Sequence, residues 1–260
     1  MCKKLASLTL SLLMMLSCFS GVFDVMATSS ENQIKLSVTF DDETAKNLID
    51  GGLSDGEIKG DVRFTDSFDG TKALSVVNPY GEVAQQYVKF PDVTFGTDDF
   101  TISFWYKATG KGGQSAWKNS SPAWNGFDSY DYTWGGTLFS NTDTGNKTNA
   151  GLSVLNLPGK LHGTYAISDG TTAYVGSQGA RDNYTGTLKN IHDSLWHKIT
   201  VTVDRTGGRA IYYVDGENTK TQDISALSGS LDSSANSLVF GADALGQYGA
   251  MYGNFDNIEV

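Results

Sequence analysis

Short runs of alternating apolar and polar residues, bounded by Gly, Asp, Asn and Ser, constrain the fold of this 260-residue chain most. In residues 100–107, Ile102, Phe104 and Tyr106 share one face, while Trp105 and polar residues share the other. A period of two is typical of a half-buried β-strand. Many such runs joined by tight turns predict an all-β sandwich or barrel.

A hairpin between Trp196 and Asp215, turning at residues 204–208, is the second clear unit. The only plausible helix is a turn around residues 42–49. The stretches 110–135 and 168–190 are interpreted as long loops, which in a compact domain are usually functional or disordered. Further strands are expected at 34–40, 72–77, 84–90, 136–140, 151–155, 160–167, 237–240 and 254–260.

The first 27 residues are typical of a secretory signal peptide: two lysines, an apolar run and a small-residue cleavage site ending at Ala27. We therefore expect export and a mature domain of residues 28–260. No second long apolar run exists, so we expect no membrane insertion. An alternative is lipidation of Cys18, because residues 16–18 loosely resemble a lipoprotein signal.

Cleavage there would leave a mature domain with distinctive chemistry. Both cysteines, Cys2 and Cys18, would be removed, which excludes disulfides, a thiol nucleophile and a thiolate zinc site. Loss of Lys3, Lys4 and Asp24 takes the formal net charge from −10 to −11. An acidic surface argues against nucleic acid or anionic lipid as a partner.

Several segments, taken in order, resemble a known family. They are Ser67-Phe68-Asp69-Gly70, residues 99–107, Thr137-Leu138-Phe139-Ser140, residues 196–204, residues 211–216 and residues 253–258. Their order and spacing resemble the laminin-G-like, concanavalin-A-like lectin/glucanase jelly-roll domains of secreted bacterial proteins, over roughly residues 33–260. The resemblance implies a jelly-roll sandwich of two antiparallel sheets with roughly a dozen strands. It leaves function open, because members include sugar-binding modules, adhesion modules and glycoside hydrolases.

Catalytic residues are not recognisable in the sequence. Glycosidic hydrolysis needs two carboxylates facing each other, and the six Glu residues are isolated. Asp128 and Asp131 lie close together, but in a Gly- and Ser-rich loop that is a poor base for paired acids. His197 lies on the apolar parity of its strand, which favours a hydrogen-bonded core histidine. The chain itself is therefore not expected to be an enzyme, although it can belong to a glycoside hydrolase or sialidase polypeptide.

The segment 117–134 is the most informative for function, because it holds three of the five Trp. A pyranose ring favours a flat aromatic ring beneath it and planar amides or carboxylates at its edge. The alternative is that these rings pack against the sandwich as a satellite core. The candidate carbohydrate-binding residues are Trp117, Trp124, Asn125, Asp128, Tyr130, Tyr132 and Trp134.

Calcium is the cofactor that the resemblance implies, as a structural ion where the first and last strands meet. The matching positions hold Asp41 or Asp42 after the first strand, and Asp256 in the last. Carboxylate oxygens suit such a hard cation.

These observations together predict a secreted, extracellular or cell-surface, lectin-like module that binds a glycan or polysaccharide without catalysis. We expect it to be monomeric and to be the targeting part of a larger glycan-degrading enzyme or surface protein, since residues 255–260 end inside an expected strand. The alternatives are an adhesion or protein-interaction module of the same fold, and a glycoside hydrolase.

Overall fold

Fifteen β-strands and no helix make up the part of the chain that the computed structural model describes. That part comprises residues 33–78, 83–109, 136–143, 149–157, 160–175, 191, 193–246 and 251–260. The compact unit of the described chain spans Ile34–Val260. The predicted signal peptide, residues 1–27, lies outside the described residues.

The fifteen strands are numbered in chain order. Their bounds are β1 Ser37–Val38, β2 Glu57–Lys59, β3 Arg63–Asp66, β4 Lys72–Asn78, β5 Tyr87–Pro91, β6 Phe100–Ala108, β7 Gly136–Ser140, β8 Gly151–Leu157, β9 Lys160–Ser168, β10 Ala173–Val175, β11 Trp196–Asp204, β12 Arg209–Val214, β13 Glu217–Asp223, β14 Ser237–Phe240 and β15 Met251–Glu259.

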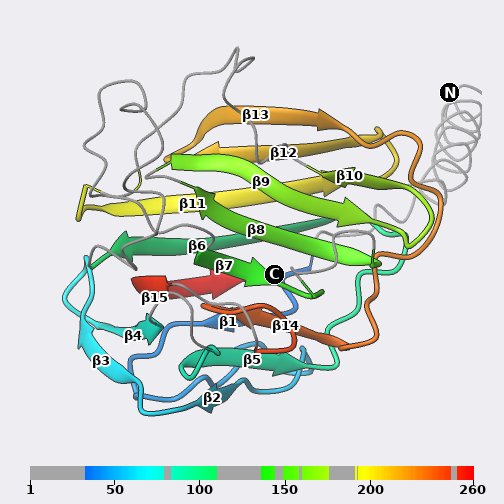
Figure 1. The fold of residues 1–260 in the computed structure, drawn as a ribbon. Helices are drawn as coiled ribbons and strands as arrows, with labels where there is room; N and C mark the ends of the chain where they lie inside the picture. The colour runs from blue at the N-terminus through cyan, green and yellow to red at the C-terminus, as the bar shows by residue number, and fades with distance from the viewer. Residues whose placement is uncertain are drawn as a thin grey trace, which may run out of the picture. The chain divides into compact units, whose positions relative to one another are not determined.

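Two antiparallel sheets lie one over the other (Figure 1), which confirms the predicted two-sheet sandwich. Sheet A has eight strands in the order β13-β12-β11-β6-β15-β4-β3, with β1 pairing with β15. Sheet B has seven in the order β10-β9-β8-β7-β14-β5-β2. The chain crosses between the sheets repeatedly, so strands distant in sequence become neighbours.

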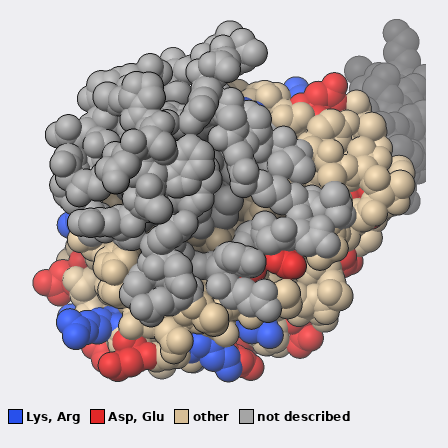
Figure 2. Space-filling view, in the orientation of Figure 1, with Lys and Arg blue, Asp and Glu red and all other residues tan. Residues whose placement is uncertain are grey.

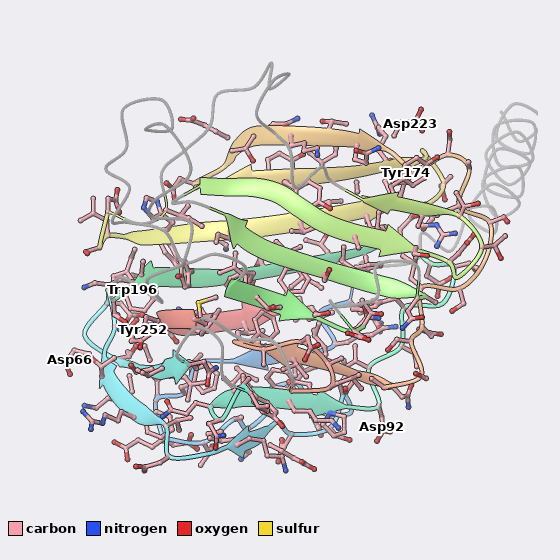
Figure 3. The ribbon with its side chains drawn as sticks, in the orientation of Figure 1. Asp66, Asp92, Tyr174, Trp196, Asp223 and Tyr252 are labelled. Atoms are coloured by element: carbon pink, nitrogen blue, oxygen red, sulfur yellow. The ribbon has the colours of Figure 1, made fainter. Side chains whose placement is uncertain are left out.

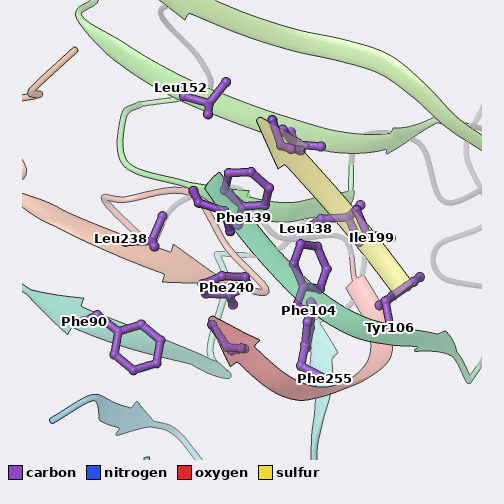
Figure 4. Close-up of a cluster of buried hydrophobic side chains, with 14 of the residues drawn as sticks. Phe90, Phe104, Tyr106, Leu138, Phe139, Leu152, Ile199, Leu238, Phe240 and Phe255 are labelled. Atoms are coloured by element: carbon purple, nitrogen blue, oxygen red, sulfur yellow. The ribbon is translucent and has the colours of Figure 1, made fainter. Parts of the chain in front are cut away.

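Aromatic rings from both sheets fill the space between them (Figure 4). Phe104 of sheet A meets Phe139 and Phe240 of sheet B edge-on, at centroid distances of 5.8 and 5.2 Å. Phe255 of β15 lies 6.0 Å from Phe104. Each of these rings is fully buried, and truncating a buried Phe to Ala typically costs about 3–5 kcal/mol. The inward residues of the alternating runs therefore form one shared core.

Two local predictions were wrong. The stretch 34–40 contributes only the two-residue strand β1, and residues 42–49 form turns and irregular structure instead of a helical turn. Glu43 has a φ of 60°, which an α-helix does not allow. Asn47 instead donates its amide to the carbonyls of Lys35 and Leu53, at 3.0 and 2.7 Å. These side-chain bonds replace helical ones.

Four short or polar strands were not predicted: β2, β3, β10 and β13. β3 and β13 end sheet A, while β2 and β10 end sheet B. Positive and negative side chains are interspersed over β2, β3 and β5 in the lower part of Figure 2, as in the 2.7 Å pair between Lys59 and Glu57. Charged edge strands are a usual protection against pairing with another chain.

Candidate functional site on the outer face of sheet A

Two central strands of sheet A, β6 and β11, carry Trp and Lys at their outward positions. Trp105 lies opposite Lys198, and Lys107 lies opposite Trp196. Side chains directly opposite on neighbouring antiparallel strands are in contact range. The four residues therefore form a two-by-two arrangement in which each Trp is beside a Lys along the strand and across it.

Phe68 adds a third ring to this face. It stacks on Trp105 with ring centroids 4.2 Å apart and planes 29° apart, and it meets Trp196 edge-on at 5.8 Å. The β3–β4 turn presents Phe68 because Asp69 accepts the backbone N–H of Thr71 at 3.1 Å and its hydroxyl at 2.5 Å. Phe68 is 41% exposed, so it forms the accessible surface of a three-ring stack.

Strand β15 borders the rings with polar groups. Asn254 lies opposite Lys107, and Asp256 lies opposite Trp105. Asn254 is only 5% exposed, and among the described residues its buried Oδ1 has no hydrogen-bond partner. Buried polar atoms are nearly always paired, so an unpaired amide oxygen at this position needs an explanation. We call Phe68, Trp105, Lys107, Trp196, Lys198 and Asn254 the outer-face patch.

Asp256 is the most perturbed acid on this face. Its side chain is fully buried; its carboxylate accepts the Ser67 hydroxyl and, at 2.7 Å, the backbone N–H of Asn257. Burial, together with the negative charges of Asp69 and Asp41, raises the pKa of Asp256 to about 6, although these hydrogen bonds act to lower it. Asp41, Asp69 and Asp256 therefore form an acidic cluster under the β3–β4 turn.

Of the two calcium ligands predicted after β1, only one belongs to the acidic cluster. Asp41 acts on Asp256 through its charge and accepts the backbone N–H of Lys72 at 3.3 Å. Asp42 instead accepts the hydroxyl of Thr44 at 2.6 Å, which lowers the pKa of Asp42. Only Asp41 is thus brought toward Asp256.

The donors at the acidic cluster are oxygens of the kind that a hard cation prefers. Within the described residues, Asp256 has no Lys or Arg partner in an ion pair. The described part of the chain contains no group of three or more His, Cys, Asp or Glu side chains that could hold a metal ion. Any ion there would need backbone carbonyls or the Ser67 hydroxyl beside the carboxylates.

His197 lies on the opposite, inner parity of β11 and is buried, as predicted. Its Nδ1 lies 2.9 Å from Asp215 Oδ2 and its Nε2 lies 3.0 Å from Asp193 Oδ1. Burial lowers the pKa of His197, but the bonds to Asp215 and Asp193 outweigh this, so the pKa lies above its usual value. The two carboxylate neighbours favour the protonated ring, and the bond to Asp215 joins β11 to the β12–β13 turn.

A sequence profile described as the concanavalin A-like lectin/glucanases superfamily matches residues 81–260. The chain belongs to this superfamily. The match confirms the resemblance drawn from the segments between Asp99 and Ile258. No curated protein is a detectable sequence relative of the chain.

Solved structures of the same fold include binding domains of botulinum neurotoxins. The serotype G binding domain aligns with a TM-score of 0.54 and 16% identity, over 87% of this chain and 47% of that one. A type C structure, whose title describes cell entry dependent on two ganglioside molecules, aligns at 0.50 and 14%, over 87% and 47%. A serotype D domain in complex with N-acetylneuraminic acid aligns at 0.50 and 14%, over 88% and 47%. The chain thus spans about half the length of these proteins, and the likeness shows a shared fold.

The seven carbohydrate-binding residues predicted from the sequence of this chain lie outside the described residues. They are Trp117, Trp124, Asn125, Asp128, Tyr130, Tyr132 and Trp134. The structure describes the two strands that this segment connects, which are β6 of sheet A before it and β7 of sheet B after it. Thr109, the last described residue before it, donates its N–H to the Tyr252 carbonyl at 3.0 Å.

Sequence reasoning did not identify Phe68, Trp196 and the two lysines as site residues. Strand parity alone could have found part of the set, because Trp196 and Lys198 share the outward face of β11. The position of Phe68 over Trp105 depends on a turn more than thirty residues earlier, and no local pattern encodes that contact. A separate finding concerns membranes: the described residues include no helix that is long and apolar enough to cross one.

Proposed function

We propose that this chain is a secreted, non-catalytic carbohydrate-binding module. The observation that carries the proposal is the outer-face patch, where the exposed ring of Phe68 is backed by Trp105 and Trp196. An exposed, rigid ring suits the apolar face of a sugar, and polar groups beside it suit the hydroxyls. Lys107 and Lys198 supply those donors.

Two further observations support the same function. The superfamily includes lectins by its own description, and domains of this fold in botulinum neurotoxins are described with gangliosides and N-acetylneuraminic acid. The segment 117–134 contributes Trp, Tyr and Asn side chains of the kind that contact sugars. Along the chain it follows β6, where Lys107 pairs with Trp196, which is labelled in Figure 3. We include these residues in the proposed binding surface.

Structural calcium is the second part of the proposal, with Asp41 and Asp256 as carboxylate ligands. The fit rests on the acidic cluster, where negative charges crowd a fully buried carboxylate. A divalent cation would relieve that repulsion and tie the chain after β1 to β15. Asp42, which is engaged with Thr44, is not included.

Secretion is the third part, with cleavage after Ala27. The mature protein would begin near Thr28, without cysteine. Intact mass of protein recovered from the culture medium tests this. A retained segment 1–27 would contradict the proposal, and a lipid adduct on Cys18 would instead indicate a membrane-anchored protein.

A glycan array with the purified full chain tests the function. We expect binding without product release, and roughly tenfold weaker binding in Phe68→Ala or Trp196→Ala, since removal of an aromatic anchor typically costs about 1 kcal/mol or more. Tyr174→Ala on the edge strand β10 of sheet B is the matched control and should bind as the wild type does (Figure 3). Release of sugar products would favour a glycoside hydrolase, and silence on every glycan would favour an adhesion module.

A further inference from the structure

The outer-face patch holds two lysines in a chain that has 29 acidic residues against 19 Lys and Arg. The lysines lie on the β6 and β11 side of the rings, whereas Asp256 and Asp69 lie on the side of β15 and the β3–β4 turn. Lys107 and Lys198 lie diagonally across β6 and β11, each beside a Trp. Within the described residues, no carboxylate forms an ion pair with either of them.

Two acids beside these strands are engaged in other hydrogen bonds. Asp256 is enclosed and bonded to Ser67. Asp215 accepts the backbone N–H of Lys198 at 2.9 Å through one oxygen and faces His197 with the other. Within the described part of the chain, both ammonium groups therefore remain available to a negatively charged ligand, beside the rings of Phe68, Trp105 and Trp196.

We propose that the outer-face patch selects acidic glycans, binding the carboxylate of a uronic or sialic acid residue between Lys107 and Lys198 while the sugar ring lies on Phe68. This inference rests on the proposed carbohydrate-binding function and names its ligand class. The inference depends on the Lys and Trp side chains of two strands, and the shared fold alone would not support it.

The spacing fits one sugar residue. Neighbouring strands and a two-residue step place the Cβ atoms of Lys107 and Lys198 roughly 8 Å apart. Flexible four-carbon stems let both ammonium groups reach one carboxylate in that interval. Phe68 stacks on Trp105, which lies opposite Lys198 and two residues before Lys107. The ring and both charges are therefore placed to contact the same ligand.

Asn254 supplies the remaining specificity. Its Oδ1 is an acceptor without a donor, directly across from Lys107. A water that links this buried oxygen to a sugar hydroxyl would satisfy it on binding.

The test compares ligands that differ only in charge. Titration of the full chain with trigalacturonate and with its methyl ester keeps the sugar rings and removes the carboxylates. The pair 3′-sialyllactose and its methyl ester does the same for a sialic acid source. We expect tighter binding of at least one acidic member, and weakening of that binding between low and high salt, because exposed charges are screened.

Variants then place the contact on the patch. Lys107→Met combined with Lys198→Met keeps the stems and removes both charges, and should weaken binding of the acidic ligand about fivefold or more, as for two partly exposed charge contacts. Lys35→Met combined with Lys89→Met removes the same net charge elsewhere and is the matched control. Asn254→Leu should also weaken acidic-sugar binding. Thermal unfolding of each variant checks that it is folded.

The outcomes separate this inference from the proposed function. Binding of neutral and acidic members with equal affinity would overturn the acidic-glycan inference and leave carbohydrate binding intact. Equal loss in the lysine pair and in its matched control would also overturn it. Binding of no glycan at all would overturn both, and tight binding of a hexaglutamate peptide instead would indicate a protein partner.

Discussion

The outward faces of the two sheets are built from different kinds of side chains. Across sheet A, one outward row runs through Asp256, Trp105 and Lys198. Across sheet B, the corresponding row runs through the smaller residues Val239, Ser140, Ser153 and Ala166 and ends at Lys89.

Burial follows that chemistry. Val239 on the outside of sheet B is 0% exposed and packs with Ala84, Ala242 and Ala244 in a second hydrophobic cluster. On sheet A the outward Val77 is 38% exposed, and Phe68 is similarly open. The comparison teaches that the outward face of sheet A is open at Val77 and Phe68, whereas sheet B is closed at Val239 on both faces. Residues that contact a ligand are therefore expected on sheet A.

The largest test of this comparison is the same substitution on both faces. Val239→Asp places an unpaired carboxylate in an enclosed apolar cluster and should cost more than about 3 kcal/mol of unfolding free energy. Val77→Asp, on the exposed outward face of β4, should cost about 1 kcal/mol or less. Urea unfolding at pH 7 measures both. Equal costs would show that the two faces are not different in burial.

Long alternating segments made the sandwich predictable. β6 and β11 follow their predicted ranges to within one residue, because Val, Ile and Phe alternate with Thr, Ser and Lys along them. β13 has almost no apolar residues and is held by pairing with β12, so no local pattern marks it. Strands of that kind depend on the sheet being already formed.

The candidate site was less predictable for the same reason. Asp256 and Asp41 could be paired from the family resemblance, because the first and last strands meet in that fold. The distinction between Asp41 and Asp42 depends on which side chain accepts from Thr44, a detail of turn geometry. The Phe68–Trp105 stack depends on a long-range contact that composition does not encode.

The next test is the pH dependence of Asp256 on the outward face. Its pKa of about 6 in the folded protein lies above the usual 3.8, so the proton is bound more tightly in the folded state. That contribution to stability is fully present below pH 3.8 and is lost as pH rises through 6. Because about two pKa units correspond to roughly 3 kcal/mol, Asp256→Asn should gain about that much relative to wild type between pH 4 and 7 in chelator. Parallel stability curves, measured by urea unfolding, would contradict it.

A smaller effect is expected from His197 on the inward face of the same sheet. Its pKa is raised above 6.5, so its stabilising charge is present below pH 6.5 and is lost as pH rises through the folded value. His197→Gln should cost about 2 kcal/mol at pH 6, since it removes the cation that both carboxylates face, and less at pH 9. His162→Gln is the control substitution. A cost that does not fall with rising pH would show that the ring acts by packing alone. The windows of Asp256 and His197 differ, which separates the two faces in one titration.

The smallest effect sharpens the comparison at a single turn. Asp41 and Asp42 are adjacent, but of these two only Asp41 raises the pKa of Asp256 through its charge.

An ion bound at the acidic cluster stabilises only the folded state, so added calcium should raise the thermal midpoint of the wild type and chelator should reverse it. Asp41→Ala should abolish this response, as should Asp256→Ala. Asp42→Ala should keep it, because that carboxylate is exposed and bonded to Thr44 within its own turn. Differential scanning calorimetry with and without calcium distinguishes the variants. Loss of the response in Asp42→Ala, with its retention in Asp41→Ala, would place the ion outside the acidic cluster and would detach it from sheet A.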